Sequence, residues 1–268
     1  MNGSHLFIAD LHLDPEPDSG QGSGVGSFAD PDLSDSPEDH SNPEAHRTAE
    51  LALRFLQQAH GKQHLYILGD LFEYWLGDDA GLPLYEPILS ALRAVRDSGC
   101  SVTVMLGNRD FLLGQAFAEA AGVTLITDDE LIITLGDHPV LLMHGDTLCT
   151  DDSDYQRFRR NVREPRWQQQ FLAKSVDERR HHAEALRAAS HDASVGKSAV
   201  IMDVNTQSVS GRLQATGCQT LIHGHTHRPA THQGPDAGQQ RLVVGDWHPD
   251  HAQYVEWDGS DFQLKTFR

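Results

Sequence analysis

Short apolar runs alternate with amphipathic stretches along this chain. Six of these runs are too short for helices and predict buried strands; they read LFIAD, LYILGD, VTVMLGN, VLLMHGD, TLIHGHTH and LVVGDW. Helical periodicity fills the intervals at 45–60, 85–98, 112–121 and 204–216, and Gly99, Gly122 and Gly217 mark expected helix ends. The alternation predicts an α/β protein.

Two stretches predict antiparallel hairpins. LIITLGDHPVLLM turns at Gly136-Asp137, and AQYVEWDGSDFQLKTF turns at Asp258-Gly259. They favour a mixed sheet, or two packed sheets, over a purely parallel sheet. A chain of 268 residues can bury one large core with a modest insertion, so we expect a single domain over 1–268.

Composition points to a cytoplasmic protein. No apolar run reaches the roughly 18–20 residues of a membrane span, and the N-terminus passes directly into the strand-like HLFIAD, which predicts no signal peptide. Cys100, Cys149 and Cys218 are far apart and lack CxxC spacing. They favour a reducing compartment, with neither a disulfide framework nor a zinc–thiolate site.

The charge is unevenly distributed. The formal net charge is −18, and residues 14–44 hold nine acidic residues and no Lys or Arg. This Gly/Ser/Pro-rich stretch predicts a disordered insertion. A metal-binding acidic loop is the alternative, but the EF-hand spacing is absent.

A basic region follows at 155–189, with nine Lys or Arg against four acids. Apolar residues recur in it at helical spacing. The pattern fits equally a solvated helical face and an amphipathic surface that meets anionic lipid or an anionic substrate.

Metal-type ligands follow most of the predicted strands. A lone Asp there is commonly a helix cap and a lone His a hydrogen-bonded core residue, as we read His223. A whole set is different, because ligands gather at the carboxyl ends of strands in open α/β sheets. The set is Asp10, His12, Asp70, Asn108, His144, His225 and His227.

The residue types indicate the chemistry. Carboxylate, carboxamide and imidazole together suit Mn²⁺, Fe²⁺ or Zn²⁺, and D-x-H and H-x-H place alternate side chains on one side. Seven ligands suit two ions that share a bridging carboxylate. Such metal pairs stabilise the attacking and leaving oxygens of a phosphoryl displacement.

The blocks DLH (10–12), GDLFE (69–73), GNRD (107–110), HGD (144–146) and GHTH (224–227) together resemble the calcineurin-like metallophosphoesterases. The resemblance implies a β-sandwich flanked by helices, with metals at the strand ends. It implies that Asp10, His12, Asp70 and His227 hold one metal. Asp70 as the bridge, with Asn108, His144 and His225, would hold the other.

A narrower resemblance covers nearly the whole chain outside residues 14–44. LYILGDLFEYWLGDD, GNRDFLLG, MHGDTLCTDDSDYQRFRR, KSAVIMDVN and IHGHTHRP resemble the UDP-2,3-diacylglucosamine diphosphatases of bacterial lipid A synthesis. This implies two Mn²⁺ ions and attack of a metal-activated water at the α-phosphate, giving UMP and 2,3-diacylglucosamine 1-phosphate. It also implies a helical cap, here 150–205. The implied substrate contacts are Asp152, Tyr155, Ser190, Ser194 and Lys197, with Asn108, Arg109 and His225 around the phosphates.

The same resemblance favours the membrane interpretation of the basic region, because the substrate is a membrane lipid. We expect a monomer that binds the cytoplasmic face of the inner membrane through its basic cap and binds no nucleic acid. Ser190 and Ser194 have the alternative of being merely solvated, and Tyr155 of being a packing residue. Two alternative functions remain open: another metallophosphoesterase activity, or a non-catalytic scaffold on this fold.

Arg109 departs from the GNH[DE] block of many metallophosphoesterases, where the His protonates the leaving group. A guanidinium cannot donate its proton, but it neutralises a phosphate well. We therefore expect Arg109 to bind the diphosphate.

Overall fold

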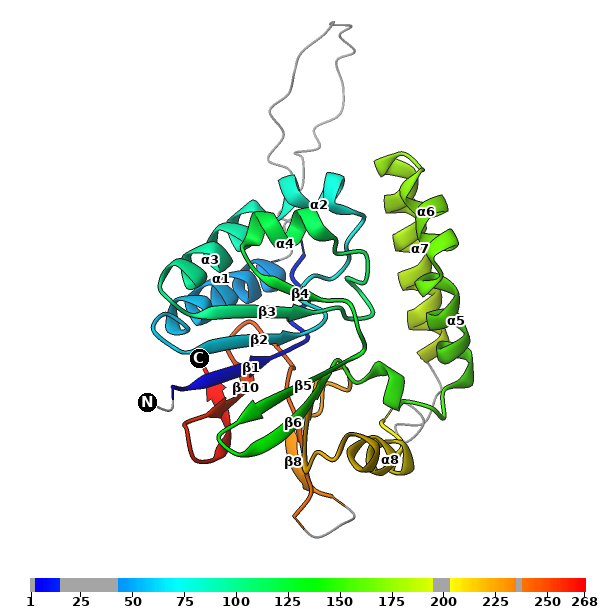
Figure 1. Ribbon diagram of the computed structural model, residues 1–268. Helices are drawn as coiled ribbons and strands as arrows, with labels where there is room; N and C mark the ends of the chain where they lie inside the picture. Colours follow the sequence, from blue (N-terminus) through cyan, green and yellow to red (C-terminus); the bar gives the residue numbers. More distant parts are fainter. Residues whose placement is uncertain (1–2, 15–42, 195–202, 235–237) are drawn as a thin grey trace, which may run out of the picture.

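The computed structural model describes residues 3–14, 43–194, 203–234 and 238–268 (Figure 1). For residues 188–194 it describes the backbone alone. Most of the predicted acidic insertion, 14–44, lies outside the described residues, and so does Lys197. The predicted boundaries of the insertion and of the cap therefore stay predictions.

Two mixed sheets form the centre of the molecule (Figure 1). The first has the order β11-β10-β1-β2-β3-β4, and β1 to β4 run parallel to one another. Its strands are β1 (His5–Ile8), β2 (His64–Leu68), β3 (Ser101–Met105), β4 (Thr124–Ile126), β10 (Ala252–Trp257) and β11 (Phe262–Phe267).

The second sheet has the order β5-β6-β7-β9-β8, in which β6, β7 and β9 run parallel. Its strands are β5 (Glu130–Leu135), β6 (His138–Met143), β7 (Thr220–His223), β8 (Ala230–Gln233) and β9 (Gln240–Val243). Both predicted hairpins are confirmed, because β5 pairs antiparallel with β6 and β10 with β11.

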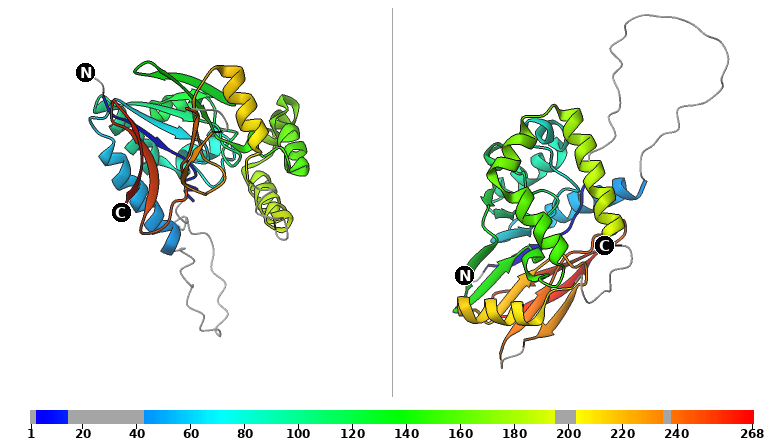
Figure 2. Two further views of the ribbon diagram at one scale, coloured as in Figure 1. Left: turned by 90° about the horizontal axis from the view of Figure 1, so that it is seen from below. Right: turned by 90° about the vertical axis from the view of Figure 1, so that its right-hand side faces the viewer.

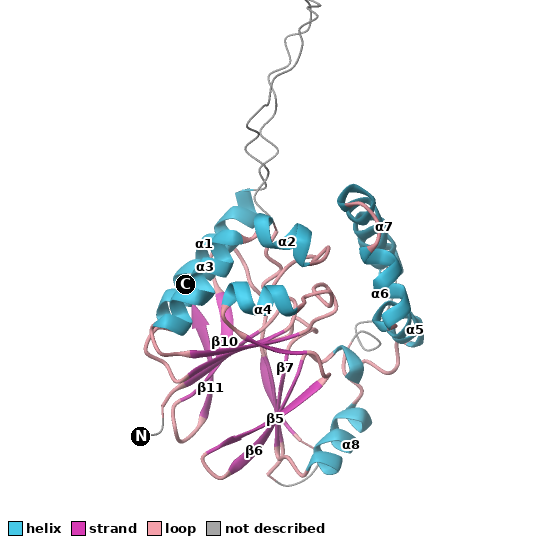
Figure 3. Cartoon of the chain, turned by 45° about the horizontal axis from the view of Figure 1, so that its top comes forward, coloured by secondary structure: helices cyan, strands magenta, loops and turns pink. Residues whose placement is uncertain are grey.

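Three apolar clusters define the layers, whose helices and strands Figure 3 shows with the top of the molecule tilted forward. One lies between the first sheet and the helices α1 (Pro43–Gln58), α3 (Glu86–Asp97) and α4 (Gln115–Ala121), with α2 (Asp78–Leu84) beside them. The second fills the space between the sheets. The third joins the outer face of β6 and β7 to α8 (Thr206–Thr216). The predicted β-sandwich flanked by helices is thus confirmed.

Three consecutive helices stand beside the sandwich, where the cap is predicted (Figures 1 and 2). They are α5 (Ser153–Arg163), α6 (Pro165–Leu172) and α7 (Val176–Ser194), and the short helix η1 (Asp146–Leu148) leads into them. Phe171 of α6 is buried in the same cluster as the core of the first sheet, and Trp167 packs against it. The three helices are therefore attached by apolar contacts as well as polar ones.

Ion pairs and hydrogen bonds fix these helices to the sandwich. On α5, Arg159 Nε lies 2.6 Å from Oδ2 of the buried Asp146, and Arg163 Nη2 donates to the Gly107 carbonyl at 2.7 Å. On α7, the buried Arg179 pairs with Asp79, and Arg187 Nη2 lies 3.0 Å from Glu73 Oε1. Four of the nine basic residues thus have partners on the sandwich, so the basic region is not one continuous charged surface.

A second polar network ties the N-terminus to the outer strands of the first sheet. Glu256 on β10 accepts a hydrogen bond from Ser4, and its two oxygens each lie 2.7 Å from a lysine ammonium, of Lys62 and of Lys265. Burial raises the pKa of Glu256, but hydrogen bonds from Lys265, Lys62 and Ser4 outweigh it and lower the pKa to about 2.

We predict that Glu256→Gln lowers the free energy of unfolding at pH 7 by roughly 1–3 kcal/mol, because three partly buried donors lose a charged acceptor. A lowered folded-state pKa contributes stability that is present above the unfolded pKa and is lost as pH falls toward the folded one. In urea unfolding, the difference between the two proteins should therefore shrink as pH falls from 4.5 toward 2. A difference that stays constant over this range would contradict the prediction.

Candidate metal centre

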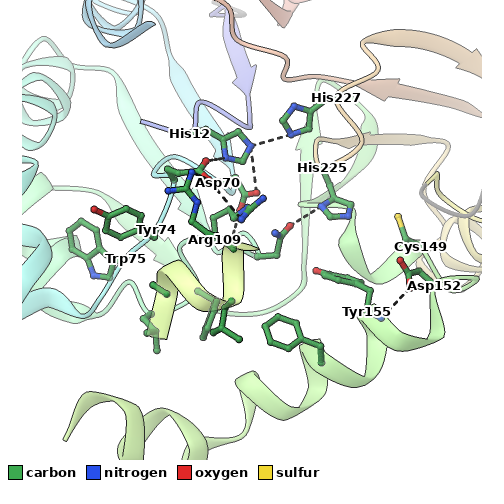
Figure 4. A pocket seen from close by; sticks show the side chains of 18 of the residues that line it. His12, Asp70, Tyr74, Trp75, Arg109, Cys149, Asp152, Tyr155, His225 and His227 are labelled. Carbon is green, nitrogen blue, oxygen red and sulfur yellow. Dashed lines mark hydrogen bonds and ion pairs between the residues drawn. The ribbon is translucent and has the colours of Figure 1, made fainter. Parts of the chain in front are cut away.

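The carboxyl ends of five strands meet at one edge of the sandwich. Asp10, Asp70 and Asn108 follow the parallel strands β1, β2 and β3, while His144 and His225 follow the parallel strands β6 and β7. Parallel strands end on the same side of a sheet, so the pattern read from the sequence becomes a spatial cluster (Figure 4).

The backbone at this edge is unusual. Among the described residues, six non-glycine residues have positive φ, between 48° and 68°. Five of them are predicted metal ligands: Asp10, His12, Asp70, His225 and His227. Such conformations cost on the order of 1–3 kcal/mol each and concentrate at functional sites. In both D-x-H and H-x-H, the two ligand residues of the pair adopt this conformation.

One group of ligands comprises Asp10, His12 and His227, whose ligand atoms all lie within 4.8 Å of one another. Nε2 of His12 lies 3.1 Å from Nε2 of His227, and Asp10 Oδ1 lies 4.0 Å from the latter nitrogen. Asp10 Oδ1 is buried and has no hydrogen-bond partner. A buried carboxylate oxygen facing two imidazole nitrogens suits a divalent cation.

A second group surrounds Asn108. Its Oδ1 lies 2.9 Å from His144 Nε2 and 2.8 Å from His225 Nδ1. His144 Nδ1 lies 2.8 Å from the Leu68 carbonyl oxygen, a contact that leaves Nε2 to face Asn108. The structure thus brings these three predicted ligands together as well.

Asp70 lies between the two groups. Its Oδ2 is 3.8 Å from His12 Nε2, and its Oδ1 is 3.7 Å from His144 Nε2. The two oxygens of one buried carboxylate therefore face different ligand groups, as a bridging ligand requires. The residues present fit a pair of divalent ions.

Burial shifts the pKa of several groups at this edge, although at His12 its lowering effect is outweighed by Glu73, Asp70 and Asp10, which raise the pKa to about 9. Burial raises the pKa of Asp10 well above its usual range, with the nearby Asp70 adding to the effect. It also lowers the pKa of His225 and of His227 to about 4, helped by His144 and His12 respectively. Both imidazoles are then neutral at pH 7, which is the form that binds metal.

Asp110 supports the centre, and the sequence reasoning did not single it out although it ends the GNRD block. Its fully buried carboxylate accepts hydrogen bonds from the backbone N–H of Gly107 at 2.8 Å, of Leu71 at 2.8 Å and of Asp70 at 3.3 Å. It thereby joins the loops after β2 and β3. Gly107 is required there, because a Cβ at this position would clash with Asp70.

A cavity of about 670 Å³ opens from the metal centre toward the three cap helices. Its polar end contains metal ligands together with Arg109, Asp152 and Tyr155 (Figure 4). The cavity is also lined by apolar and aromatic side chains, which include Trp75, Leu76, Leu112, Phe158, Trp167 and Phe171.

The predicted substrate contacts fall into two groups. Tyr155 lies with its ring centroid 5.8 Å from that of His225 and donates its hydroxyl to Asp146, while Asp152 caps α5 through the Tyr155 N–H. Both line the cavity, although each also has a structural contact. Ser190 and Ser194 belong to α7, but their side chains, like Lys197, lie outside the described part of the chain.

A β-sandwich with two groups of carboxylate, amide and imidazole ligands at its strand ends defines a metallophosphoesterase. The chain belongs to the calcineurin-like phosphoesterase family, which residues 5–229 match, and membership implies divalent metal ions.

Curated relatives narrow the resemblance. The chain is 50% identical over 187 residues to the UDP-2,3-diacylglucosamine hydrolase of Chromohalobacter salexigens, covering 69% of this chain and 76% of that protein. It is 42% identical over 246 residues to the hydrolase of the same name from Marinobacter nauticus, covering 90% of this chain and 88% of that protein. Among solved structures, wild-type Vps29 complexed with Zn²⁺ from Entamoeba histolytica aligns at 14% identity and a TM-score of 0.42, over 99% of this chain and 97% of that one.

We predict that Asp110→Asn lowers metal affinity on the order of 10- to 100-fold, which is the usual effect of replacing a residue that positions the metal ligands. The neutral amide replaces a carboxylate that holds the backbone of both loops. Metal content after dialysis against graded Mn²⁺ concentrations would measure the loss. Asp97→Asn, which changes an exposed carboxylate on α3, is the matched control and should retain full affinity. Equal metal content in the two variants would refute the role of Asp110.

Proposed function

We propose that this protein hydrolyses the pyrophosphate bond of UDP-2,3-diacylglucosamine, giving UMP and 2,3-diacylglucosamine 1-phosphate. The observation that carries the proposal is one cavity that is lined both by phosphoesterase-type ligands and by aromatic and aliphatic side chains. The substrate has the same two parts, a diphosphate and two acyl chains. The names of the curated relatives support the same substrate.

We assign Asp10, His12, Asp70 and His227 to one ion, and Asp70, Asn108, His144 and His225 to the other. Mn²⁺ is the proposed ion, although Fe²⁺ and Zn²⁺ accept the same ligands. When bound, the pair supplies Lewis-acid stabilisation of phosphate charge and lowers the pKa of water toward neutrality. The distances of Asp70 to His12 and His144 support its role as the bridge.

Water attacks the α-phosphorus, and the bond from this phosphorus to the bridging oxygen breaks. The bridging oxygen leaves with the β-phosphate as part of the lipid 1-phosphate, and the α-phosphate stays with the nucleoside as UMP. A phosphate monoester has a second pKa of about 6, so this leaving group needs little protonation at pH 7. Its charge must be neutralised instead.

Arg109 meets that requirement. Its backbone N–H donates to Asp70 Oδ1 at 2.8 Å, and its guanidinium lines the cavity beside the ligand groups (Figure 4). The side chain is 31% exposed, so it can reach a bound diphosphate. Tyr155 and Asp152 line the same end of the cavity, and we propose that Ser190, Ser194 and Lys197 complete the binding of the head group.

We further propose that α5, α6 and α7 cover the acyl chains and that the outer surface of this cap meets anionic lipid. Leu172 is 41% exposed, which is unusual for a large apolar side chain, and Phe158, which lines the cavity, is 39% exposed. Arg157, Arg160, Arg166 and Arg180 are exposed on the same three helices. Apolar side chains beside arginine suit peripheral binding at the cytoplasmic face of the inner membrane. None of the helices described is long and apolar enough to span a bilayer.

We expect turnover of UDP-2,3-diacylglucosamine to require a divalent ion and to yield UMP and 2,3-diacylglucosamine 1-phosphate by mass spectrometry. In water enriched in ¹⁸O, the label should enter UMP, because attack is at the α-phosphorus. Parallel assays with Mn²⁺, Fe²⁺ and Zn²⁺ after chelation identify the preferred ion. A higher kcat/KM for a generic aryl phosphate than for the lipid nucleotide would refute the assignment.

We predict that Arg109→His lowers kcat/KM for the lipid nucleotide at least tenfold, which corresponds to about 1.4 kcal/mol. Histidine keeps the loop backbone but removes the guanidinium that neutralises the departing phosphate. Arg54→His is the matched control, because Arg54 lies over the ring of Phe267, away from the cavity. If both variants keep wild-type kcat/KM, Arg109 does not bind the diphosphate.

A further inference from the structure

Glu73 contacts both the metal centre and the cap. It lies shortly after β2, in the block GDLFE, with its side chain 13% exposed. Its Oε2 lies 2.9 Å from His12 Nδ1. Its other oxygen, Oε1, lies 3.0 Å from Nη2 of Arg187 on α7 and 3.8 Å from Arg109 Nη1. One carboxylate therefore meets a proposed metal ligand, a cap helix and the proposed phosphate-binding arginine.

We propose that Glu73 is a positioning residue that couples metal binding to the docking of α7 over the cavity. Metal loading and cap docking then stabilise one another. The inference rests on the proposed ligand assignment of His12, and it is independent of which phosphate ester is cleaved.

On the metal side, Glu73 sets the orientation of His12. The contact with Nδ1 directs Nε2 of the same ring toward Asp70, at 3.8 Å, and His227, at 3.1 Å. A ligating histidine whose second nitrogen meets a carboxylate is fixed in its tautomer and ring orientation. Removal of the carboxylate leaves the ring free to turn away from the ion.

On the cap side, α7 has two polar anchors of different kinds. Arg179 is buried and binds Asp79 together with the Leu76 carbonyl, none of which is a proposed metal ligand. Arg187 lies two turns further along the helix and binds Glu73. Only the second of these two anchors shares its acceptor with the metal centre.

The shared carboxylate makes the coupling reciprocal. When His12 is fixed by an ion, Oε2 is held in place and Oε1 faces Arg187, so less conformational freedom is lost when α7 docks. By linkage, a docked α7 favours metal binding by the same factor. Arg187 and Arg109 both line the cavity, so the same carboxylate also orders cationic groups beside the substrate.

The test measures metal binding and helix protection without substrate. Free Mn²⁺ is followed by electron paramagnetic resonance during titration, and hydrogen exchange of the α7 amides is compared with and without Mn²⁺. In the wild-type protein Mn²⁺ should slow exchange in α7. In Glu73→Gln, Mn²⁺ affinity should fall on the order of 10- to 100-fold, and saturating Mn²⁺ should no longer slow exchange in α7.

Two further variants separate the coupling from a general loosening of the cap. Arg187→Met changes a side chain that is 43% exposed, keeps the His12–Glu73 contact, and should abolish the metal dependence of α7 exchange with a smaller loss of affinity than Glu73→Gln. Asp79→Asn cuts the other anchor, at a residue 62% exposed, and should speed exchange in α7 while leaving Mn²⁺ affinity and its effect on exchange unchanged.

Wild-type Mn²⁺ affinity in Glu73→Gln would overturn the proposal, and so would α7 exchange that does not respond to Mn²⁺ in the wild-type protein. An equal loss of affinity in Asp79→Asn and Glu73→Gln would also overturn it, because it would reveal only a looser cap. Failure of the protein to cleave UDP-2,3-diacylglucosamine would change none of these measurements, so the two proposals fail separately.

Discussion

The concentration of buried carboxylates at the strand ends is the constraint on which this structure depends. Asp10, Asp70, Asp110 and Asp146 are each at most 2% exposed, and they lie close enough to influence one another or the same histidines. Burying a charge costs several kcal/mol unless it is paired or hydrogen-bonded. Each carboxylate must therefore be compensated, and the way in which each is compensated determines a part of the fold.

Two of the four are compensated by the protein itself. Asp110 is surrounded by backbone N–H groups, which joins the loops after β2 and β3. Asp146 receives the guanidinium of Arg159, and although burial acts to raise its pKa, His144 and Arg159 hold the pKa below its usual range. That ion pair also fixes α5 to the sandwich. Asp10 and Asp70 each accept a backbone hydrogen bond, from His225 and Arg109, but among the described residues neither forms an ion pair with Lys or Arg. A pair of bound metal ions would complete this arrangement.

Much of this could be predicted from the sequence because it is local. The ligands stand directly after short apolar runs, and the two hairpins contain Gly at their turns. The length of the apolar runs and the turn residues are therefore enough to locate these features in the sequence. Asp110 and Glu73 stand inside the sequence blocks GNRD and GDLFE. The role of Asp110 depends on the backbone N–H groups around it, and that of Glu73 on the helix that packs against it. Arg159 and Arg187 look like members of a basic surface in the sequence, whereas in the structure Arg159 pairs with Asp146 and Asp129, and Arg187 pairs with Glu73. Such pairings connect residues far apart in the chain and leave no periodic signal.

The same constraint connects the metal centre to the substrate that we propose. The cap helices are held over the site by ion pairs to carboxylates at or beside the ligand loops and by apolar contacts of Trp167 and Phe171 with the core of the first sheet. The cavity beneath them keeps aromatic side chains available to acyl chains, and one charged anchor, Glu73 with Arg187, lines the same cavity. An arginine in place of the usual histidine at Arg109 fits this division, since a diphosphate brings charge to be neutralised rather than an alkoxide to be protonated. The chemistry of the leaving group and the attachment of the cap thus draw on the same few carboxylates and guanidinium groups.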